Sequence, residues 1–110
     1  MPSPFTDFHA HVYFTEDTQH HAKSLYERLT SEVPDVQRGT FHTRTVGPHP
    51  TWMFTVSFTA KDFQALTLWL MGNLDGLSTL VHPLSGNDLL DHTQYALWFG
   101  PQLELHLDKL

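Results

Sequence analysis

Residues 8–14, with the sequence FHAHVYF, alternate between apolar side chains and side chains that carry ring nitrogens or a hydroxyl. Because successive side chains of a strand point to opposite faces, one face is wholly apolar and the other carries His9, His11 and Tyr13. The apolar face predicts a strand packed on a hydrophobic core. A face that is only exposed to water does not require two imidazoles and a phenol. We therefore expect this face to carry a polar site.

Two segments have the spacing of amphipathic helices. Over residues 15–33, apolar side chains recur at i, i+3, i+4 and i+7, which predicts one buried stripe. Thr15 or Thr18 is placed to cap the start of this helix, and Pro34 ends it. A second helix is predicted over residues 62–73, where apolar side chains again follow helical spacing.

Further strands are predicted on either side of the second helix, in the segments 37–45, 51–58 and 76–83. Residues 84–92 are predicted as a loop, and the remainder of the chain as one or two strands around Gly100 and Pro101. The resulting order βαββαβ, with a C-terminal strand extension, is that of an α+β ferredoxin-like sandwich. Such a fold has one antiparallel sheet in the strand order 4-1-3-2, with both helices on one face.

This topology gathers histidines that are far apart in the sequence. The fourth strand runs antiparallel beside the first, so His82 is expected near His9. His92 follows ten residues later and can return to the same end of the sheet, and His49 joins if its loop folds over the sheet. The face that carries these side chains can be covered only by the C-terminal extension or by a second subunit. An exposed strand with incidental histidines is the alternative interpretation, since the His-x-His pattern is weak by itself.

Composition limits the classes of function. The chain of 110 residues is long enough for one domain, expected over residues 1–110, and its 6 Lys and Arg against 12 Asp and Glu give a net charge of −6. The lack of clustered positive charge argues against nucleic-acid binding and against an anionic membrane surface. There is no cysteine, no basic and apolar leader segment and no apolar run of the roughly 20 residues that span a bilayer. We therefore expect a cytoplasmic protein.

Histidine is the unusual residue, with 9 copies in the chain. Neutral imidazole is a common ligand of divalent first-row metals. The sequence contains no G-x-S-x-G motif, no phosphate-binding loop and no convincing pair of carboxylates for glycoside chemistry. Metal chemistry is therefore the reaction class that the residues favour.

Four blocks of the sequence together resemble the DOPA 4,5-dioxygenase family of bacteria and fungi. They are FHAHVYF, VGPHPTWMFTVSF, GLSTLVHPLSG and DLLDHTQYALWFG, and the resemblance spans residues 8–107. It implies a ferredoxin-like fold, a homodimer, and extradiol cleavage of a catechol such as L-DOPA by non-haem Fe(II) and O₂. The family's histidines fall on five positions of this chain: His9, His11, His49, His82 and His92.

The resemblance leads us to assign six side chains to three roles: His11, His82 and His92 as metal ligands, His49 or His9 in proton transfer, and Tyr13 as a hydrogen-bond partner of the substrate. A carboxylate as third ligand is an alternative, with Glu104 as the candidate. Zinc or nickel is expected as a substitute for iron in purified protein.

Two other functions fit the same residues. The first is a non-catalytic histidine-rich module that binds a metal or an aromatic ligand. The second is an enzyme that oxidises an aromatic compound without any cofactor, and whose activity a chelator leaves unchanged.

Overall fold

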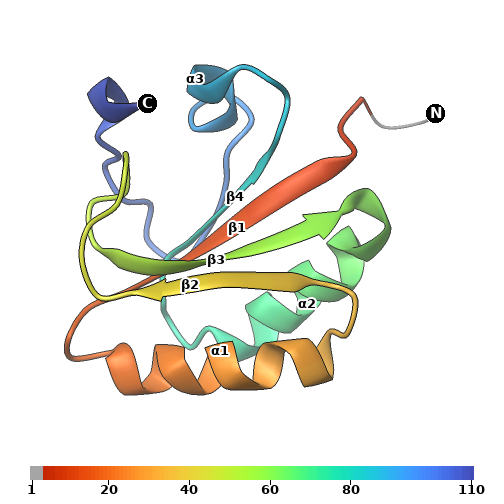
Figure 1. Cartoon of the computed structure of the whole chain (residues 1–110), viewed down its shortest axis with the longest axis vertical. Helices are drawn as coiled ribbons and strands as arrows, with labels where there is room; N and C mark the ends of the chain where they lie inside the picture. The colour runs from red at the N-terminus through yellow and green to blue at the C-terminus, as the bar shows by residue number, and fades with distance from the viewer. Residues whose placement is uncertain (1–3) are drawn as a thin grey trace.

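The computed structural model describes residues 4–110 and contains one five-stranded sheet in the order β2-β3-β1-β4-β5 (Figure 1). All neighbouring strands are antiparallel. The elements are β1 (Asp7–Phe14), α1 (Gln19–Glu32), β2 (Gln37–His42), β3 (Trp52–Thr59), η1 (Ala60–Asp62), α2 (Phe63–Asn73), β4 (Thr79–Pro83), α3 (Asp88–Asp91), β5 (Leu97–Phe99) and η2 (Leu107–Lys109). The predicted ferredoxin-like order 4-1-3-2 is confirmed, and β5 extends the sheet beside β4.

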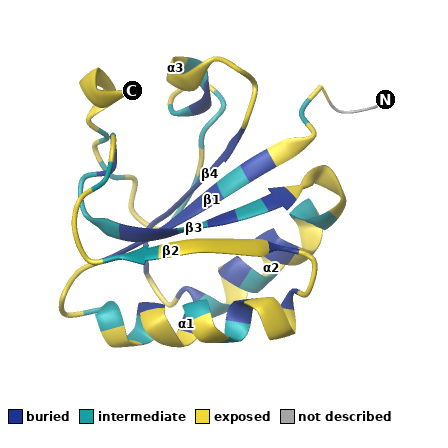
Figure 2. Cartoon of the chain, viewed as in Figure 1, coloured by how far each residue is buried: buried dark blue, intermediate teal, exposed yellow. Residues whose placement is uncertain are grey.

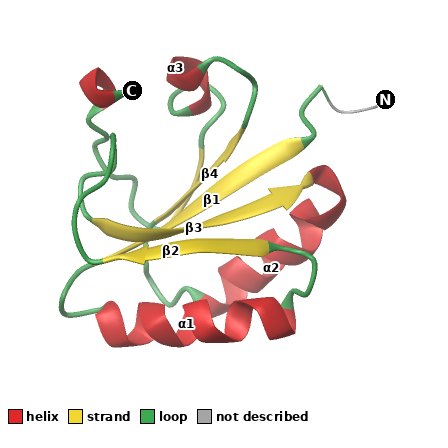
Figure 3. Cartoon of the chain, in the orientation of Figure 1, coloured by secondary structure: helices red, strands yellow, loops and turns green. Residues whose placement is uncertain are grey.

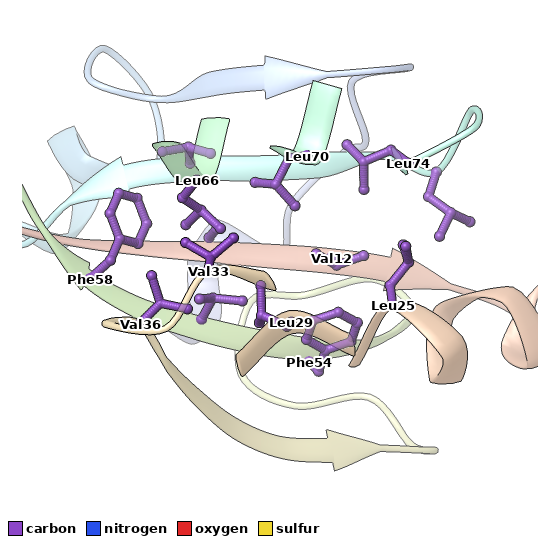
Figure 4. Close-up of a cluster of buried hydrophobic side chains, with 14 of the residues drawn as sticks. Val12, Leu25, Leu29, Val33, Val36, Phe54, Phe58, Leu66, Leu70 and Leu74 are labelled. Carbon is purple, nitrogen blue, oxygen red and sulfur yellow. The ribbon is translucent and has the colours of Figure 1, made fainter. Parts of the chain in front are cut away.

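The two long helices cover one face of the sheet, as the alternation in β1 and β3 predicts (Figure 3). Leu25 and Leu29 of α1 and Leu66 and Leu70 of α2 are fully buried against this face, where they meet Val12 of β1 (Figure 4). Burial of each such side chain stabilises the fold by about 1.5–3 kcal/mol. The helices thus cover the apolar face of the sheet, and the opposite face, which carries the histidines, is not in contact with them.

Several boundaries differ from the sequence prediction. Thr18 stands before α1, but its hydroxyl accepts a hydrogen bond from the Thr15 backbone N–H (2.8 Å) and does not cap the helix. The segment predicted as a loop over residues 84–92 contains α3, because the Asn87 side chain accepts from the Leu90 N–H (3.0 Å) and caps a short helical turn. Strand β2 ends at His42, three residues before the predicted end.

Strand β2 lies at an edge of the sheet, and its first four residues are exposed (Figure 2). The central strands β1 and β4 are almost wholly buried. Side chains on these central strands are therefore shielded from water on both faces, which is where a metal or acid–base site gains the most from a low dielectric.

The C-terminal part of the chain covers the second face of the sheet. Tyr13, Met53 and Leu80 are buried there, with five partly buried side chains packed against them: Val46, Ala96, Trp98, Leu103 and Leu105. Only β5 is a strand in this part, which agrees with the prediction of one or two strands there. Of the two covers expected for this face, the C-terminal extension or a second subunit, these residues show the extension.

Two backbone features hold this covering segment in place. Gly100 has φ of 69°, and a Cβ there would lie 3.0 Å from the Leu77 carbonyl oxygen, so the chain turns at a position that favours glycine. Beyond the turn, the His106 N–H donates to the Pro48 carbonyl (2.7 Å). The covering segment is thereby tied to the β2–β3 loop.

None of the helices within residues 4–110 has the length and apolarity that a membrane crossing requires.

Candidate metal centre

Strand register brings the first three histidines together. His9 of β1 is paired with His82 of β4, and His11 lies two residues further along the same face. The ring centroids of His9 and His11 are 5.6 Å apart, those of His9 and His82 are 5.6 Å apart, and those of His11 and His82 are 5.0 Å apart. The predicted proximity of His9 and His82 is confirmed.

Two loops supply the other histidines. His49 lies in the β2–β3 loop, where its N–H donates to the Val46 carbonyl (3.1 Å), and its ring centroid is 4.2 Å from that of His11. His92 follows α3 directly, and its ring centroid is 4.4 Å from that of His82 and 6.2 Å from that of His49. The structure therefore gathers all five histidines that the sequence analysis selected.

The cluster has the dimensions of a metal-binding site. Within residues 4–110, two sets of three histidines each place one ligand nitrogen per residue within 4.8 Å of the others: His9, His11 and His82, and His11, His49 and His92. His11 belongs to both sets, neither includes Glu104, and the predicted combination of His11, His82 and His92 is neither of them. The rings of the predicted ligands His11, His82 and His92 lie 4.4–6.5 Å apart.

Hydrogen bonds fix the rings of His82 and His92 from behind. The Nδ1 of His82 donates to the Pro83 carbonyl (2.8 Å), and the Nδ1 of His92 donates to the Asp88 carbonyl (2.7 Å). A carbonyl only accepts, so both Nδ1 atoms carry the proton in the neutral ring and both Nε2 atoms keep a lone pair. This is the arrangement in which histidines commonly ligate metals, with the second ring nitrogen held by another group.

The ring of His11 lies between strand β3 and His82. Its Nδ1 is 2.9 Å from the Thr55 hydroxyl, and its Nε2 is 2.9 Å from the Nε2 of His82. Two nitrogens bound at about 2.1 Å to one ion at a right angle lie about 3.0 Å apart. The distance between the two Nε2 atoms therefore suits one shared cation, which would replace the proton held between them.

The Tyr13 hydroxyl holds His49. It is 2.7 Å from the His49 Nδ1, and the Tyr13 ring, 2% exposed, stacks on Trp98 with centroids 5.9 Å apart. Burial raises the pKa of Tyr13, so the phenol stays protonated at all ordinary pH values. The role of Tyr13 toward a substrate stays a prediction, and its contact with His49 is a feature that the sequence analysis missed.

Burial favours the uncharged form of four histidines of the cluster: His9, His11, His49 and His82. Desolvation, followed by the neighbouring His92, lowers the pKa of His49 to about 4. Desolvation also lowers the pKa of His82 to about 4, against the opposing effect of its bond to Pro83. The pKa values of His11 and His9 are lowered as well, chiefly by burial. Metal ligation needs unprotonated imidazole, so the free centre is prepared for a cation at neutral pH.

Asp91, the last residue of α3, forms no hydrogen bond with a histidine within residues 4–110. Its carboxylate is 2% exposed and accepts from the Ser85 N–H (3.1 Å) and the Ser85 hydroxyl (2.6 Å). These bonds close the β4–α3 loop on itself. Asp91 therefore acts on the site by fixing the loop that delivers His92, and its charge adds a small upward influence on the pKa of His82.

An open cleft of about 480 Å³ reaches the cluster at His92. Nine residues line it: His92, Thr93, Ala96, Trp98, Gln102, Leu103, Glu104, Leu105 and Leu107. Trp98 and the leucines give it apolar walls, so a flat aromatic molecule can lie beside the metal centre. Of these lining residues only His92 and Glu104 were selected from the sequence, since the place of the others at the cleft depends on how the covering segment returns to the sheet.

Comparisons with known proteins agree with this geometry. The sequence profile described as the Dopa 4,5-dioxygenase family matches residues 8–109. A protein of Nostoc punctiforme, whose crystal structure is described as that of a "putative dioxygenase", superposes with a TM-score of 0.91 at 38% sequence identity, over 96% of this chain and 90% of that one.

Two curated fungal proteins are also similar. An "Uncharacterized 21.2 kDa protein" of Botryotinia fuckeliana is 40% identical over 91% of this chain and 61% of its own length. A "DOPA 4,5-dioxygenase" of Amanita muscaria is 27% identical over the whole of this chain and 52% of its own length. The chain thus spans between half and two thirds of the length of these curated relatives.

Proposed function

Because the chain belongs to the Dopa 4,5-dioxygenase family, we propose that it cleaves the aromatic ring of a catechol, extradiol to its hydroxyls, with Fe(II) and O₂. One observation carries the proposal. Five histidines with lone pairs available for a cation meet beside a cleft whose wall contains an aromatic ring. An L-DOPA-like catechol is the substrate that the family implies.

Three histidines are the proposed metal ligands: His11, His82 and His92. The Nδ1 of each is held by another group, and the Nε2 atoms of His11 and His82 lie 2.9 Å apart. When bound, ferrous iron would hold the catechol oxygens and O₂ together and pass electron density between them. The iron itself is part of the proposal, because an all-nitrogen site also suits zinc and nickel.

His9 and His49 are the proposed proton-transfer groups. His9 is partly exposed, and neither of its ring nitrogens has a hydrogen-bond partner among residues 4–110, so it can take the proton of a catechol hydroxyl. The Nδ1 of His49 is held by Tyr13, so its Nε2 is the atom available to hold or return a proton. Trp98 would position the ring of the substrate by stacking.

Anaerobic reconstitution with Fe(II), followed by air and a panel of catechols, tests the proposal. We expect O₂ consumption and a yellow ring-cleavage product, both abolished by a chelator. His11→Gln and His82→Gln should lose iron and turnover, whereas His20→Gln, on the exposed surface of α1, should keep both. Full iron content and turnover in both site variants would overturn the ligand assignment, and chelator-resistant activity would favour the cofactor-free alternative.

A non-catalytic metal-binding module is the second candidate function. The observation that favours it is that both candidate ligand sets consist of histidines alone, which zinc and nickel accept readily. Tight zinc binding without any turnover of catechols by the iron-loaded protein would support this alternative.

The homodimer, the cytoplasmic location and the single domain over residues 1–110 stay predictions. Light scattering of the purified protein tests whether it is a homodimer.

A further inference from the structure

The cleft beside the histidines has an uneven distribution of charge. Glu104 is the only carboxylate among its lining residues, and no lysine or arginine lines it. A substrate side chain that extends from the ring toward the covering segment therefore meets a negative charge. A carboxylate on that side chain would find no cation in the lining.

Glu104 is available for such a contact. The ion pairs described within residues 4–110 are Arg28–Glu32 and Lys61–Asp35, and Glu104 takes part in neither. Its side chain is exposed and forms no hydrogen bond in that part of the chain. Its neighbours Leu103 and Leu105 pack on the sheet, which fixes the backbone at Glu104 along the cleft.

We propose that Glu104 makes the cleft selective for catechols whose side chain ends in a protonated amine, and that it disfavours those ending in a carboxylate. This inference rests on the proposed function, because it takes the cleft to be the substrate site. The aromatic ring lies between Trp98 and the leucines, with its hydroxyls toward His92. The ammonium group then lies on the side of Glu104, where opposite charges attract.

The expected size of the effect follows from exposure. Ion pairs open to solvent typically change an equilibrium by about 0.2–1 kcal/mol, which corresponds to about a 1.4- to fivefold change in Kd. Salt should weaken the preference, since the Debye length falls to about 3 Å at 1 M ionic strength. A selectivity of this size is modest but within reach of titration calorimetry.

Binding to the zinc-loaded protein under anaerobic conditions tests the inference without turnover. The probes are dopamine, 4-ethylcatechol and 3-(3,4-dihydroxyphenyl)propionate, which have similar size and differ in charge. We expect Kd to rise in that order, by about 1.4- to fivefold at each step. Glu104→Gln should bring the three values together, and Glu104→Lys should reverse the order.

Asp108→Asn is the matched control, because Asp108 is an exposed carboxylate of η2 that does not line the cleft. It should leave the order of Kd values unchanged. The inference would be overturned if the parent protein bound the propionate as tightly as dopamine or more tightly. It would also be overturned if the order of the three Kd values stayed the same in Glu104→Gln. The order of Kd values in the zinc-loaded protein is independent of ring cleavage, so a binding preference without turnover would refute the proposed reaction and leave the selectivity standing.

Discussion

The Nε2 atom of His11 lies 2.9 Å from the Nε2 atom of His82, although 71 residues separate the two in sequence. The His82 Nε2 keeps its lone pair, since its Nδ1 donates to the Pro83 carbonyl. In the metal-free protein, His11 must therefore donate the proton between them. A cation that replaces this proton would be held by both lone pairs, so metal binding and the stability of the fold are coupled at this point.

This coupling predicts a large thermal stabilisation by metal. A ligand present at a hundredfold excess over its Kd stabilises the folded state by about 2.7 kcal/mol, which raises the Tm of a domain of this size by about 10 °C. We expect zinc to produce such a shift in calorimetry. His82→Gln should abolish most of it, whereas His20→Gln should respond like the parent. A full shift in His82→Gln would show that His82 is not a ligand.

Removal of the Tyr13 hydroxyl should affect His49 specifically. Tyr13→Phe leaves a buried ring nitrogen without its partner, which costs about 1–3 kcal/mol of unfolding free energy. Tyr26→Phe is the matched control, since its hydroxyl donates to the Gly39 carbonyl at the exposed side of α1. Urea unfolding measures both variants, and we expect the loss to be larger for Tyr13→Phe. Equal losses would argue against a special role of the Tyr13–His49 contact.

The stability of the metal-free protein should fall as the pH drops from about 6.5 to about 4. Histidine in the unfolded chain has a pKa near 6.5, whereas burial holds the folded pKa values of His49 and His82 near 4. Between these limits the unfolded state binds more protons, so acid favours unfolding. Each pKa unit corresponds to about 1.4 kcal/mol, which makes the total loss a few kcal/mol.

Urea unfolding of chelator-treated protein at a series of pH values measures this loss. A double variant, His49→Gln with His82→Gln, should show a shallower dependence over the same interval. A parent stability that stays constant from pH 6.5 to 4 would contradict the buried, neutral state of these two rings.

Much of the site follows from strand alternation and from the order of elements. The alternation in residues 8–14 places His9 and His11 on one face, and antiparallel pairing of the first and fourth strands brings His82 beside them. These steps depend only on the period of a strand and on a common topology. The fold and the meeting of His9, His11 and His82 could therefore be predicted, whereas His49 was expected only on the condition that its loop folds over the sheet.

The contacts that fix the histidines could not be predicted in the same way. Thr55 reaches His11 through a cross-strand register that becomes definite only when the pairing of β1 with β3 is known. The bond between Tyr13 and His49 depends on the path of the β2–β3 loop, and the position of Trp98 depends on the turn at Gly100. Loop paths are set by many weak contacts that leave no periodic pattern in the sequence.

The turn at Gly100 provides the last prediction, because it directs the covering segment back over the histidine face. Gly100→Ala combines a positive φ with a Cβ only 3.0 Å from the Leu77 carbonyl oxygen, a backbone atom that cannot easily move away. Gly47→Ala is the matched control, since Gly47 also has positive φ but nothing lies within 4 Å of the added Cβ.

We expect Gly47→Ala to lower the unfolding free energy by about 1 kcal/mol, because a residue with a Cβ is less stable than glycine in the left-handed backbone conformation. Gly100→Ala should cost clearly more, about 2–3 kcal/mol, since the clash adds to that backbone cost. It should also weaken binding of a catechol to the zinc-loaded protein, because Trp98, Leu103 and Leu105 lie on either side of the turn and line the cleft. Equal stability of the two variants, with unchanged catechol binding, would show that the turn does not determine the shape of the cleft.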